Sequence, residues 1–225
     1  EKLGTVKYLS DPNQKDLIKI IDKFHVIFTN PNKSKIYLGE NLLKKAKKLR
    51  VISTASTGTN HIDKEYAFKN KIKILSLTNE LKIIKKISST AELALTLTLA
   101  SIRNILPANK SVIKGKWDYT KFIGNQINFL NIGVIGYGRL GSIFTKYCLA
   151  LGAAVFVYDP YKKIKNKKIT QLKKINDLLK ISDVISIHIH AAKETEKFIN
   201  KNLLKKMKKN VILINTSRGE IIDEN

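Results

Sequence analysis

The sequence predicts an α/β protein with two doubly wound parallel sheets. Short apolar runs alternate with amphipathic stretches along the whole 225-residue chain, which is the pattern of helices that cover a parallel sheet. The alternation is interrupted once, by a long apolar helix at residues 90–105 and an irregular stretch that contains Pro107. We therefore expect two domains, one at residues 1–100 and one at residues 101–225.

In the first half of the chain, apolar runs predict four strands with helices between them. The expected strands are TVKYL (5–9), HVIFT (25–29), RVISTAS (50–56) and IKILSL (72–77). The expected helices are KDLIKIIDKF (15–24), NLLKKAKKL (41–49) and DKEYAFKN (63–70). The long helix that follows begins with Thr90 and Glu92, which suit a first turn because a hydroxyl caps free N–H groups and an acid complements the helix dipole.

The same alternation restarts after the irregular stretch. The expected strands are NIGVIG (131–136), AAVFVYD (153–159), DVISIHIH (183–190) and VILINTS (211–217). The expected helices are RLGSIFTKYCLALG (139–152), ITQLKKINDLLKI (169–181) and KNLLKKMKK (201–209). Because a helix separates each pair of strands, the strands are expected to run parallel.

The formal net charge of +24 raises the question of a polyanionic partner. Four of the 42 basic residues are arginines, so 42 − 4 = 38 are lysines, which lack the planar fork that reads bases and clamps phosphates. The lysine clusters lie on or beside expected amphipathic helices, where a solvated face explains them. We favour a solvated surface, and polyanion or nucleic-acid binding stays as an alternative.

The sequence carries no targeting or membrane signal. No apolar run approaches the ~20 residues that a membrane helix requires, and the first residues lack the order of a signal peptide. Cys148 is the only cysteine and lies in an apolar helix, which predicts a buried thiol without a disulfide. We expect a cytoplasmic protein without a membrane partner. The chain begins at Glu1 rather than Met, which indicates a partial sequence.

A glycine-rich sequence, GYGRLG, joins an expected strand to the helix that follows it. Gly136, Gly138 and Gly141 give the spacing G-x-G-x-x-G in the strand, turn and helix context that the motif requires. Gly136 permits the tight turn, Gly138 lets the backbone approach a pyrophosphate, and Gly141 lets helix and strand pack closely. The helix N-terminus, at Arg139 and Leu140, offers free amides to phosphates. The motif predicts a Rossmann dinucleotide-binding domain.

The next strand ends in an acid that completes this pattern. Asp159 lies 18 residues beyond Gly141, where a carboxylate accepts hydrogen bonds from the ribose hydroxyls of the adenosine and repels a 2′-phosphate. The sequence therefore predicts NAD rather than NADP as the cofactor. Lys162 and Lys163 follow closely enough to weaken that preference.

From about Arg50 onward, seven segments resemble successive blocks of the NAD-dependent D-2-hydroxyacid dehydrogenases, a family that includes phosphoglycerate, D-lactate and glycerate/hydroxypyruvate dehydrogenases. The order and the spacing of the segments also match. The segments are STGTNHID, SSTAELALTLTLASIRNI, GKWDYTKFIGNQ, NIGVIGYGRLG, VFVYDP, SDVISIHIHAAKET and MKKNVILINTSRGEIIDEN. The resemblance implies a substrate domain at 1–100 and an NAD-binding domain at 101–225, each Rossmann- or flavodoxin-like.

The resemblance also implies roles for residues of the first domain. In STGTNHID the family binds the substrate carboxylate through backbone amides, which here belong to Thr57 and Gly58, and an exposed amide pair makes a plausible anion nest. His61 matches a non-catalytic position and is interpreted as structural. Ser89 falls where a hydroxyl of the family approaches the nicotinamide, although the loop at 78–89 looks longer than usual.

Two histidines alternate on the strand DVISIHIH and share one face. His188 and His190 have no third ligand nearby in the sequence, so we interpret them as cofactor wall or packing rather than as a metal site. Family members place this strand end along the cofactor, which implies that Ile189 contacts NAD.

Arg218 is the candidate catalytic and substrate-binding residue. It follows the strand VILINTS, and ligands of open α/β sheets collect beyond the carboxyl ends of the strands. A guanidinium can hold the carboxylate and the carbonyl oxygen of a 2-oxo acid and stabilise charge on that oxygen. The resemblance gives the matching arginine this role and places Thr216 and Ser217 at the nicotinamide.

The function implied is hydride transfer between NAD and C2 of a small D-2-hydroxy acid of the phosphoglycerate, hydroxypyruvate/glycerate or lactate type. The resemblance also implies a homodimer. The acid/base histidine and its glutamate are expected after residue 225, so the sequence is interpreted as C-terminally truncated. A non-catalytic NAD-binding module, or a corepressor of the same family, is the first alternative, and polyanion binding through the lysines is the second.

Overall fold

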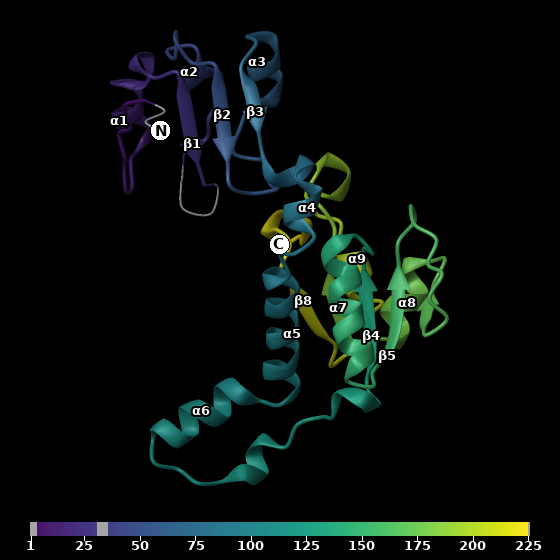
Figure 1. Ribbon diagram of the computed structural model, residues 1–225. Coiled ribbons are helices and arrows are strands. Elements are labelled where there is room, and N and C mark those ends of the chain that lie inside the picture. The colour runs from purple at the N-terminus through teal and green to yellow at the C-terminus, as the bar shows by residue number, and fades with distance from the viewer. Residues whose placement is uncertain (1–3, 31–35, 225) are drawn as a thin grey trace. The chain divides into compact units, whose positions relative to one another are not determined.

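The computed structural model describes residues 4–30 and 36–224 (Figure 1). The chain divides into two compact units, Glu1–Lys86 and Ile87–Asn225, and each unit has its own parallel sheet. The two-sheet α/β architecture confirms the predicted fold class. Among the described helices, none is long and apolar enough to cross a membrane.

The division between the units falls earlier than the expected boundary after residue 100. Helix α5 (Ser89–Ile102) packs against α7 (Arg139–Ala150) and β8 (Ile212–Asn215), so the long apolar helix is part of the second unit.

Unit 1 is a three-stranded parallel sheet in the order β1-β2-β3 with short helices packed on one face. The strands are β1 (Val26–Thr29), β2 (Val51–Thr54) and β3 (Lys73–Leu75). The helical segments are α1 (Gln14–Ile18), η1 (Ile21–Lys23), α2 (Glu40–Leu43), α3 (Lys64–Lys69), η2 (Leu77–Asn79) and α4 (Leu81–Ile84). Ile27, Ile52 and Ile74 stand side by side across the three strands and form the centre of the core.

The predicted strand at residues 5–9 is wrong. This segment is not a strand, and Val6 and Tyr8 are 88% and 80% exposed. The described sheet of unit 1 consists of β1, β2 and β3, and residues 5–9 pair with none of them.

Unit 2 has a five-stranded parallel sheet in the order β6-β5-β4-β7-β8. The strands other than β8 are β4 (Asn131–Ile135), β5 (Ala154–Tyr158), β6 (Ile169–Gln171) and β7 (Val184–Ile187). The helical segments besides α5 and α7 are α6 (Ile105–Ile113), η3 (Tyr119–Phe122), η4 (Ile127–Phe129), α8 (Ile175–Ile181), η5 (Lys193–Thr195), α9 (Lys201–Leu204) and η6 (Gly219–Ile221). The order reverses at β4, which is the topological switch point of a doubly wound sheet.

Both faces of this sheet are buried, as the near-continuous apolar strands predict. On one face Ile132 and Val134 of β4 join a core cluster with Phe144 of α7 and with residues of α5. On the other face Ile135 packs with Leu178 of α8. The alternation of side chains along β4 therefore distributes its residues between two cores.

Two expected helices are corrected. The helix predicted at 90–105 ends at Ile102, because Asn104 takes a left-handed conformation with φ of 53° and α6 starts anew at Ile105. The helix predicted at 169–181 begins only at Ile175, since residues 169–171 form the edge strand β6 beside β5.

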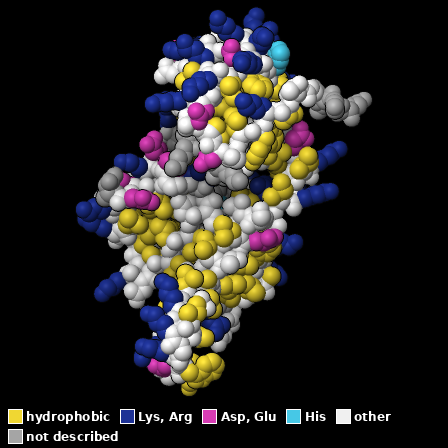
Figure 2. All heavy atoms as spheres, turned by 90° about the vertical axis from the view of Figure 1, so that its left-hand side faces the viewer, with side chains coloured by type: hydrophobic (Ala, Val, Ile, Leu, Met, Phe, Trp, Pro, Cys, Tyr) yellow, Lys and Arg dark blue, Asp and Glu magenta, His cyan; other side chains and the backbone are white. Residues whose placement is uncertain are grey.

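Exposed apolar side chains gather on α6 and on the segment after it. These residues, called the α6 surface below, are Ile105, Leu106, Val112, Ile113, Trp117, Tyr119, Ile123 and Phe129. Figure 2 shows hydrophobic side chains over the lower part of the molecule, where this segment lies in Figure 1. Such a concentration exceeds the scattered apolar residues of ordinary surfaces.

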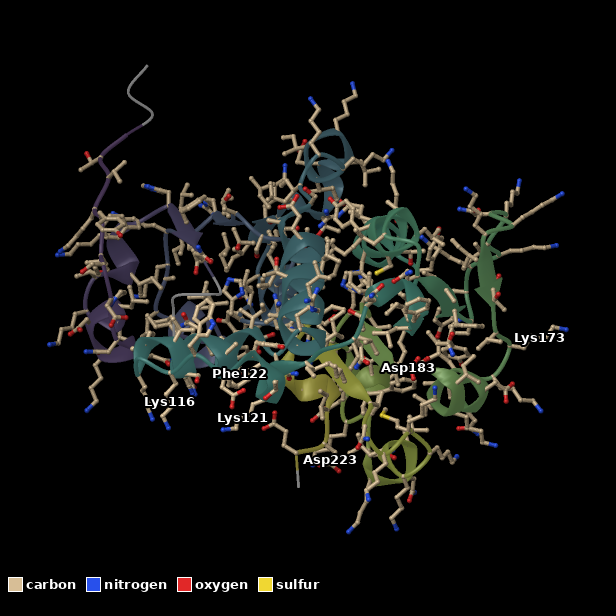
Figure 3. The ribbon with its side chains drawn as sticks, turned by 90° about the horizontal axis from the view of Figure 1, so that it is seen from below. Lys116, Lys121, Phe122, Lys173, Asp183 and Asp223 are labelled. Atoms are coloured by element: carbon tan, nitrogen blue, oxygen red, sulfur yellow. The ribbon has the colours of Figure 1, made fainter. Side chains whose placement is uncertain are left out.

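An acidic side chain joins β4, β7 and the segment after α9 at the amino edge of the sheet. Asp183, labelled in Figure 3, accepts the N–H of Asn131 at 2.9 Å and pairs with the ammonium of Lys208 at 2.7 Å. The N–H of Asp183 in turn donates to the carbonyl of Asn131 at 2.8 Å. This network lies opposite the carboxyl edge and is structural.

Candidate functional site

The glycine-rich loop lies at the carboxyl end of β4, at the switch point of the sheet. Gly136 has a φ of +91°, and a Cβ there would lie 2.6 Å from the carbonyl oxygen of His188. A Cβ at Gly141 would lie 2.1 Å from the carbonyl oxygen of Gly136. At Gly138 a Cβ would meet no atom within 4 Å. Packing therefore explains the first and third glycines, and the second faces open space.

The start of α7 offers free amides to this open space. Gly138 is the N-cap and makes no side-chain cap, and the first N–H that bonds back to its carbonyl is that of Ser142, at 3.0 Å. The N–H groups of Arg139, Leu140 and Gly141 are therefore available to a ligand. No acid stands in the first turn, so the positive end of the helix dipole is uncompensated. The residues present fit the pyrophosphate of a dinucleotide.

Asp159 lies directly beside the glycine-rich loop. Its carboxylate accepts the N–H of Tyr137 at 2.7 Å, of Tyr161 at 2.9 Å and of Lys162 at 3.1 Å. A carboxylate has about four acceptor positions, so one position remains for a ribose hydroxyl. Asp159 thus holds both the glycine-rich loop and the loop that follows β5. The sequence pattern alone did not reveal this role.

The two residues after β7 form the opposite wall of the loop. The imidazole Nε2 of His188 lies 2.9 Å from Oγ of Ser186, and its ring centroid lies 5.1 Å from that of Phe144. Burial lowers the pKa of His188 to about 4, so the ring is neutral near pH 7. Ile189 reaches the loop, because its Cγ2 lies 2.8 Å from the position of a Cβ on Gly136. No group of three or more potential metal ligands exists among the described residues.

The turn after β8 carries Thr216, Ser217 and Arg218. The hydroxyl of Ser217 donates to the carbonyl of Ile187 at 3.0 Å, which ties this turn to the end of β7. The hydroxyl of Thr216 is buried and has no hydrogen-bond partner in the described part of the chain. The Arg218 side chain is exposed, and its Nη1 donates to the carbonyl of Ser217 at 2.9 Å. Within the described residues it forms no ion pair, so the guanidinium is open to an anion.

The sequence pattern missed Asn215, the last residue of β8. Its Oδ1 accepts the N–H of Ser217 at 2.9 Å and its Nδ2 donates to the carbonyl of Arg218 at 2.8 Å. An asparagine two residues before a polar turn residue is a signal for this geometry, because its side chain bonds the backbone two positions on.

Arg139 connects the glycine-rich loop with the segment before α5. Its Nη1 donates a hydrogen bond to the carbonyl of Ile87. Ser89 is the first residue of α5, two residues after this contact. The structure therefore brings the start of α5 next to the start of α7, as expected if Ser89 lies near the cofactor.

The candidate substrate turn belongs to unit 1 and follows β2. The carbonyl of Thr57 accepts the hydroxyl of Thr78 at 3.1 Å, and the carbonyl of Gly58 accepts that of Ser56 at 2.7 Å. Neither N–H group of Thr57 and Gly58 donates to another described residue. Hydroxyl groups thus hold the turn by its carbonyls and leave its amides available for an anion. His61 is half-buried nearby, and its carbonyl accepts the N–H of Leu38 at 2.8 Å.

A shallow groove of about 550 Å³, largely open to solvent, lies beside this turn, between α3 and the edge strand β3. Its lining combines hydroxyl groups and two lysines with apolar side chains. The lining residues are Thr59, Lys64, Phe68, Ile72, Lys73, Ile74, Ser76, Thr78 and Asn79. The groove is continuous with the turn, because Thr78 contacts Thr57 and Thr59 follows Gly58.

Comparisons with known proteins agree with this arrangement. Residues 95–225 match the family model of the D-isomer specific 2-hydroxyacid dehydrogenase, NAD binding domain. The chain is 36% identical over 214 residues to D-3-phosphoglycerate dehydrogenase of Archaeoglobus fulgidus, which covers 94% of this chain and 39% of that protein. It is 33% identical to hydroxypyruvate reductase of Thermotoga maritima, over 93% of this chain and 65% of that protein.

Solved structures give the same result. The D-lactate dehydrogenase of Aquifex aeolicus, complexed with NAD and lactic acid, superposes with a TM-score of 0.79 at 32% identity. That match covers 96% of this chain and 62% of the other. The NAD-dependent formate dehydrogenase of Staphylococcus aureus, in complex with NAD, superposes with a TM-score of 0.83 at 26% identity and covers 93% and 62%. The present chain spans about two-fifths of the length of the phosphoglycerate dehydrogenases that it matches. The chain belongs to the D-isomer specific 2-hydroxyacid dehydrogenase family, and its second unit carries the NAD-binding domain.

Proposed function

We propose that the protein transfers a hydride between NAD and C2 of a small D-2-hydroxy acid or the corresponding 2-oxo acid. The observation that carries the proposal is the position of Arg218. Its exposed guanidinium, free of any ion pair to a described residue, follows β8 at the carboxyl edge that also holds the glycine-rich loop. Substrate and cofactor sites of open α/β sheets share this edge.

The roles proposed for individual residues follow from their contacts. The amides at Arg139, Leu140 and Gly141 bind the pyrophosphate, Gly138 gives room for it, and Gly136 permits the tight turn before it. The remaining acceptor position of Asp159 binds a ribose hydroxyl. The side chains that face the rest of the cofactor are Ser89, Ile189, Thr216 and Ser217.

When bound, NAD would accept the hydride in the oxidation of the hydroxy acid, and NADH would donate it in the reduction of the oxo acid. Arg218 holds the substrate carboxylate and stabilises the negative charge that develops on the C2 oxygen during reduction. In this proposal the amides of Thr57 and Gly58 also bind the substrate carboxylate, as the resemblance implies. The oxygen then takes a proton, for which the family resemblance implies a histidine held by a glutamate, beyond residue 225.

Binding measurements test this proposal independently of turnover. Titration with NADH is expected to change NADH fluorescence, and oxamate, an analogue of a 2-oxo acid, is expected to bind the complex of protein and NADH. An Arg218→Gln variant is expected to keep NADH binding and to lose oxamate affinity about 100-fold, because a charge-assisted two-point contact of about 3 kcal/mol disappears. Unchanged oxamate affinity in this variant would refute the proposal.

Turnover distinguishes the enzyme from its alternatives. The assay uses a protein that includes the histidine and the glutamate that the resemblance implies, and in it an enzyme oxidises NADH in the presence of a 2-oxo acid such as pyruvate or hydroxypyruvate. If that protein binds NADH and oxamate but oxidises no NADH, it fits the non-catalytic module or corepressor. A polyanion binder instead shows affinity for duplex DNA that falls steeply with salt, in proportion to the number of phosphates contacted.

The groove beside Thr59 favours a substrate with a second anionic group over lactate. Lys64 and Lys73 line this groove together with the hydroxyls of Ser76 and Thr78, and the lining residues include no acidic side chain. A phosphate or second carboxylate fits such surroundings. The protein should bind 3-phosphohydroxypyruvate more tightly than pyruvate, and Lys64→Gln should reduce this difference in affinity. The matched variant Lys69→Gln, on the same helix but outside the groove, should leave it unchanged.

The proposed assembly is a homodimer formed through the α6 surface. Trp117 is 91% exposed, Ile113 76% and Leu106 69%, which is unusual for large apolar side chains of a monomer. In a twofold contact the same surface is buried on both partners, so a single set of residues forms the whole interface. Lys116 and Lys121, both labelled in Figure 3, lie in the same segment and can remain at the rim of such a contact.

A further inference from the structure

The amide of Asn215 brackets the turn that carries Arg218. Its Oδ1 accepts the N–H of Ser217 at 2.9 Å and its Nδ2 donates to the carbonyl of Arg218 at 2.8 Å. Both distances are those of well-formed hydrogen bonds. The asparagine side chain has both the NH2 donor and the oxygen acceptor that these two hydrogen bonds require. Aspartate or serine at this position could form only one of the two.

The bracket extends to the guanidinium itself. Nη1 of Arg218 donates to the carbonyl of Ser217 at 2.9 Å. Asn215 holds the N–H of the same residue, so both backbone groups of Ser217 take part in this arrangement. The hydroxyl of Ser217 fixes the same residue to the carbonyl of Ile187 at the end of β7. The direction of the arginine therefore depends on three hydrogen bonds that converge on Ser217.

The backbone beyond these hydrogen bonds adds one long contact, in which the N–H of Ile221 donates to the carbonyl of Arg218 at 3.4 Å. Arg218 is the N-cap of η6, with φ of −147° and ψ of 147°, and its side chain makes no cap hydrogen bond. The side chain is exposed. An exposed arginine has several rotatable bonds, and holding its fork in one place reduces the entropy that substrate binding must remove.

We propose that Asn215 is a positioning residue for the substrate, which holds the turn so that the Arg218 guanidinium is directed at the substrate site. The inference rests on the proposed function of Arg218. Asn215 itself contacts neither substrate nor cofactor in this proposal. It acts through the backbone of Ser217 and Arg218.

Two variants separate the parts of the bracket. Asn215→Ala removes both hydrogen bonds, and Asn215→Asp keeps an acceptor for Ser217 but places a carboxylate oxygen against the carbonyl of Arg218. We expect Asn215→Ala to weaken oxamate binding to the complex of protein and NADH by about tenfold, since two hydrogen bonds of about 0.5–1.5 kcal/mol each are lost. Asn215→Asp should weaken it by a similar factor, because it loses the hydrogen bond to the carbonyl of Arg218 and sets a carboxylate oxygen against that carbonyl. The dissociation constant of NADH should stay within about threefold, because the glycine-rich loop is untouched.

Asn200 provides the matched control for loss of stability. Its Oδ1 accepts the N–H groups of Asn202 at 3.0 Å and of Leu203 at 3.2 Å, so Asn200→Ala also removes two hydrogen bonds from unit 2. The thermal midpoint of this variant should fall by as much as that of Asn215→Ala, and its oxamate affinity should be unchanged. A general structural role of Asn215 predicts instead that both variants lose oxamate affinity in proportion to stability.

The outcomes separate this inference from the function on which it rests. Oxamate affinity that is lost in Arg218→Gln and kept in both Asn215 variants overturns the positioning role and leaves the proposed function intact. Equal losses of NADH and oxamate affinity in Asn215→Ala also overturn it. Oxamate affinity that is kept in Arg218→Gln, or absent in the unaltered protein, refutes the proposed function and the positioning role with it.

Discussion

The carboxylate of Asp159 accepts a hydrogen bond from the backbone N–H of Tyr137 at 2.7 Å, so the end of β5 holds the glycine-rich loop that follows β4. The same carboxylate also fixes the N–H groups of Tyr161 and Lys162. The acid that is proposed to select NAD therefore also shapes the site in which NAD is proposed to lie. This double role determines what its replacement should do.

Asp159→Asn is expected to weaken NADH binding about tenfold and to raise the affinity for NADPH relative to NADH. The change removes the charge that repels a 2′-phosphate and part of the acceptor capacity that holds Tyr137. Fluorescence titrations with both cofactors measure the ratio. Asp118→Asn, at an exposed ion pair with Lys121, changes the net charge equally and should leave the ratio unaltered. A preference for NADH that persists in Asp159→Asn would contradict the proposed role.

Two glycines of the loop should respond differently to the same added methyl group. Gly138→Ala should fold with little loss of stability, because its Cβ meets no atom within 4 Å, but it should lose NADH affinity at least tenfold if the pyrophosphate lies there. Gly141→Ala should lower the free energy of unfolding by several kcal/mol, since its Cβ would lie 2.1 Å from the carbonyl oxygen of Gly136. Urea unfolding and NADH titration of both variants check this. Unchanged NADH affinity in Gly138→Ala would place the phosphates elsewhere.

The sequence predicted the second sheet well because each of its signals is local. The strand, glycine turn, helix and Asp159 follow one another within about thirty residues, as the dinucleotide-binding pattern requires, and the structure has them in that order. The edge strand β6 was missed, because its three residues run directly into an amphipathic helix pattern and their pairing with β5 depends on tertiary contact. The break at Asn104 was missed for the same reason, since the apolar pattern continues across it.

The sequence marks candidate site residues, which stay predictions, but it does not mark the hydrogen bonds that connect them. Arg218 and the glycines are marked by their residue type and by their place after a strand. The bracket from Asn215 and the contact of Arg139 with Ile87 depend on side-chain directions that the sequence does not specify. The predicted strand at 5–9 is an error of the other kind. Its residues alternate between apolar and polar as in a strand, but they do not join the sheet.

His188 should make the protein less stable as the pH falls from about 6.5 toward 4. Burial lowers its pKa in the folded protein to about 4, below the usual 6.5, so in this interval the unfolded chain binds a proton that the folded protein does not. The free energy of unfolding should therefore fall by up to about 3 kcal/mol from this residue. Urea unfolding at pH 7.5 and 5 measures the change. In His188→Asn the difference between the free energies of unfolding at pH 7.5 and pH 5 should be smaller. If this difference is unchanged, other groups cause the pH dependence.

The single thiol should report global unfolding. Cys148 is fully buried in α7, and burial raises its pKa to about 12, so the reactive thiolate is almost absent in the folded protein. Reaction with a thiol reagent in native buffer should be slower than in urea by several orders of magnitude, set by the equilibrium of unfolding. Rapid labelling without a loss of ellipticity would show that α7 opens locally.

The α6 surface should control the oligomeric state. Leu106→Glu with Ile113→Glu places two like charges on each copy of the surface, and in a twofold contact these charges oppose one another, so the dimer should dissociate. Light scattering after gel filtration measures the mass, with a dimer expected for the unaltered protein and a monomer for the variant. NADH binding should persist in the variant, because α6 lies apart from the carboxyl edge of the sheet. Phe68→Glu in unit 1, where Phe68 is 86% exposed, is the matched control and should remain a dimer. A monomeric unaltered protein would refute the assembly, and a dimer that survives both Glu substitutions would place the interface elsewhere.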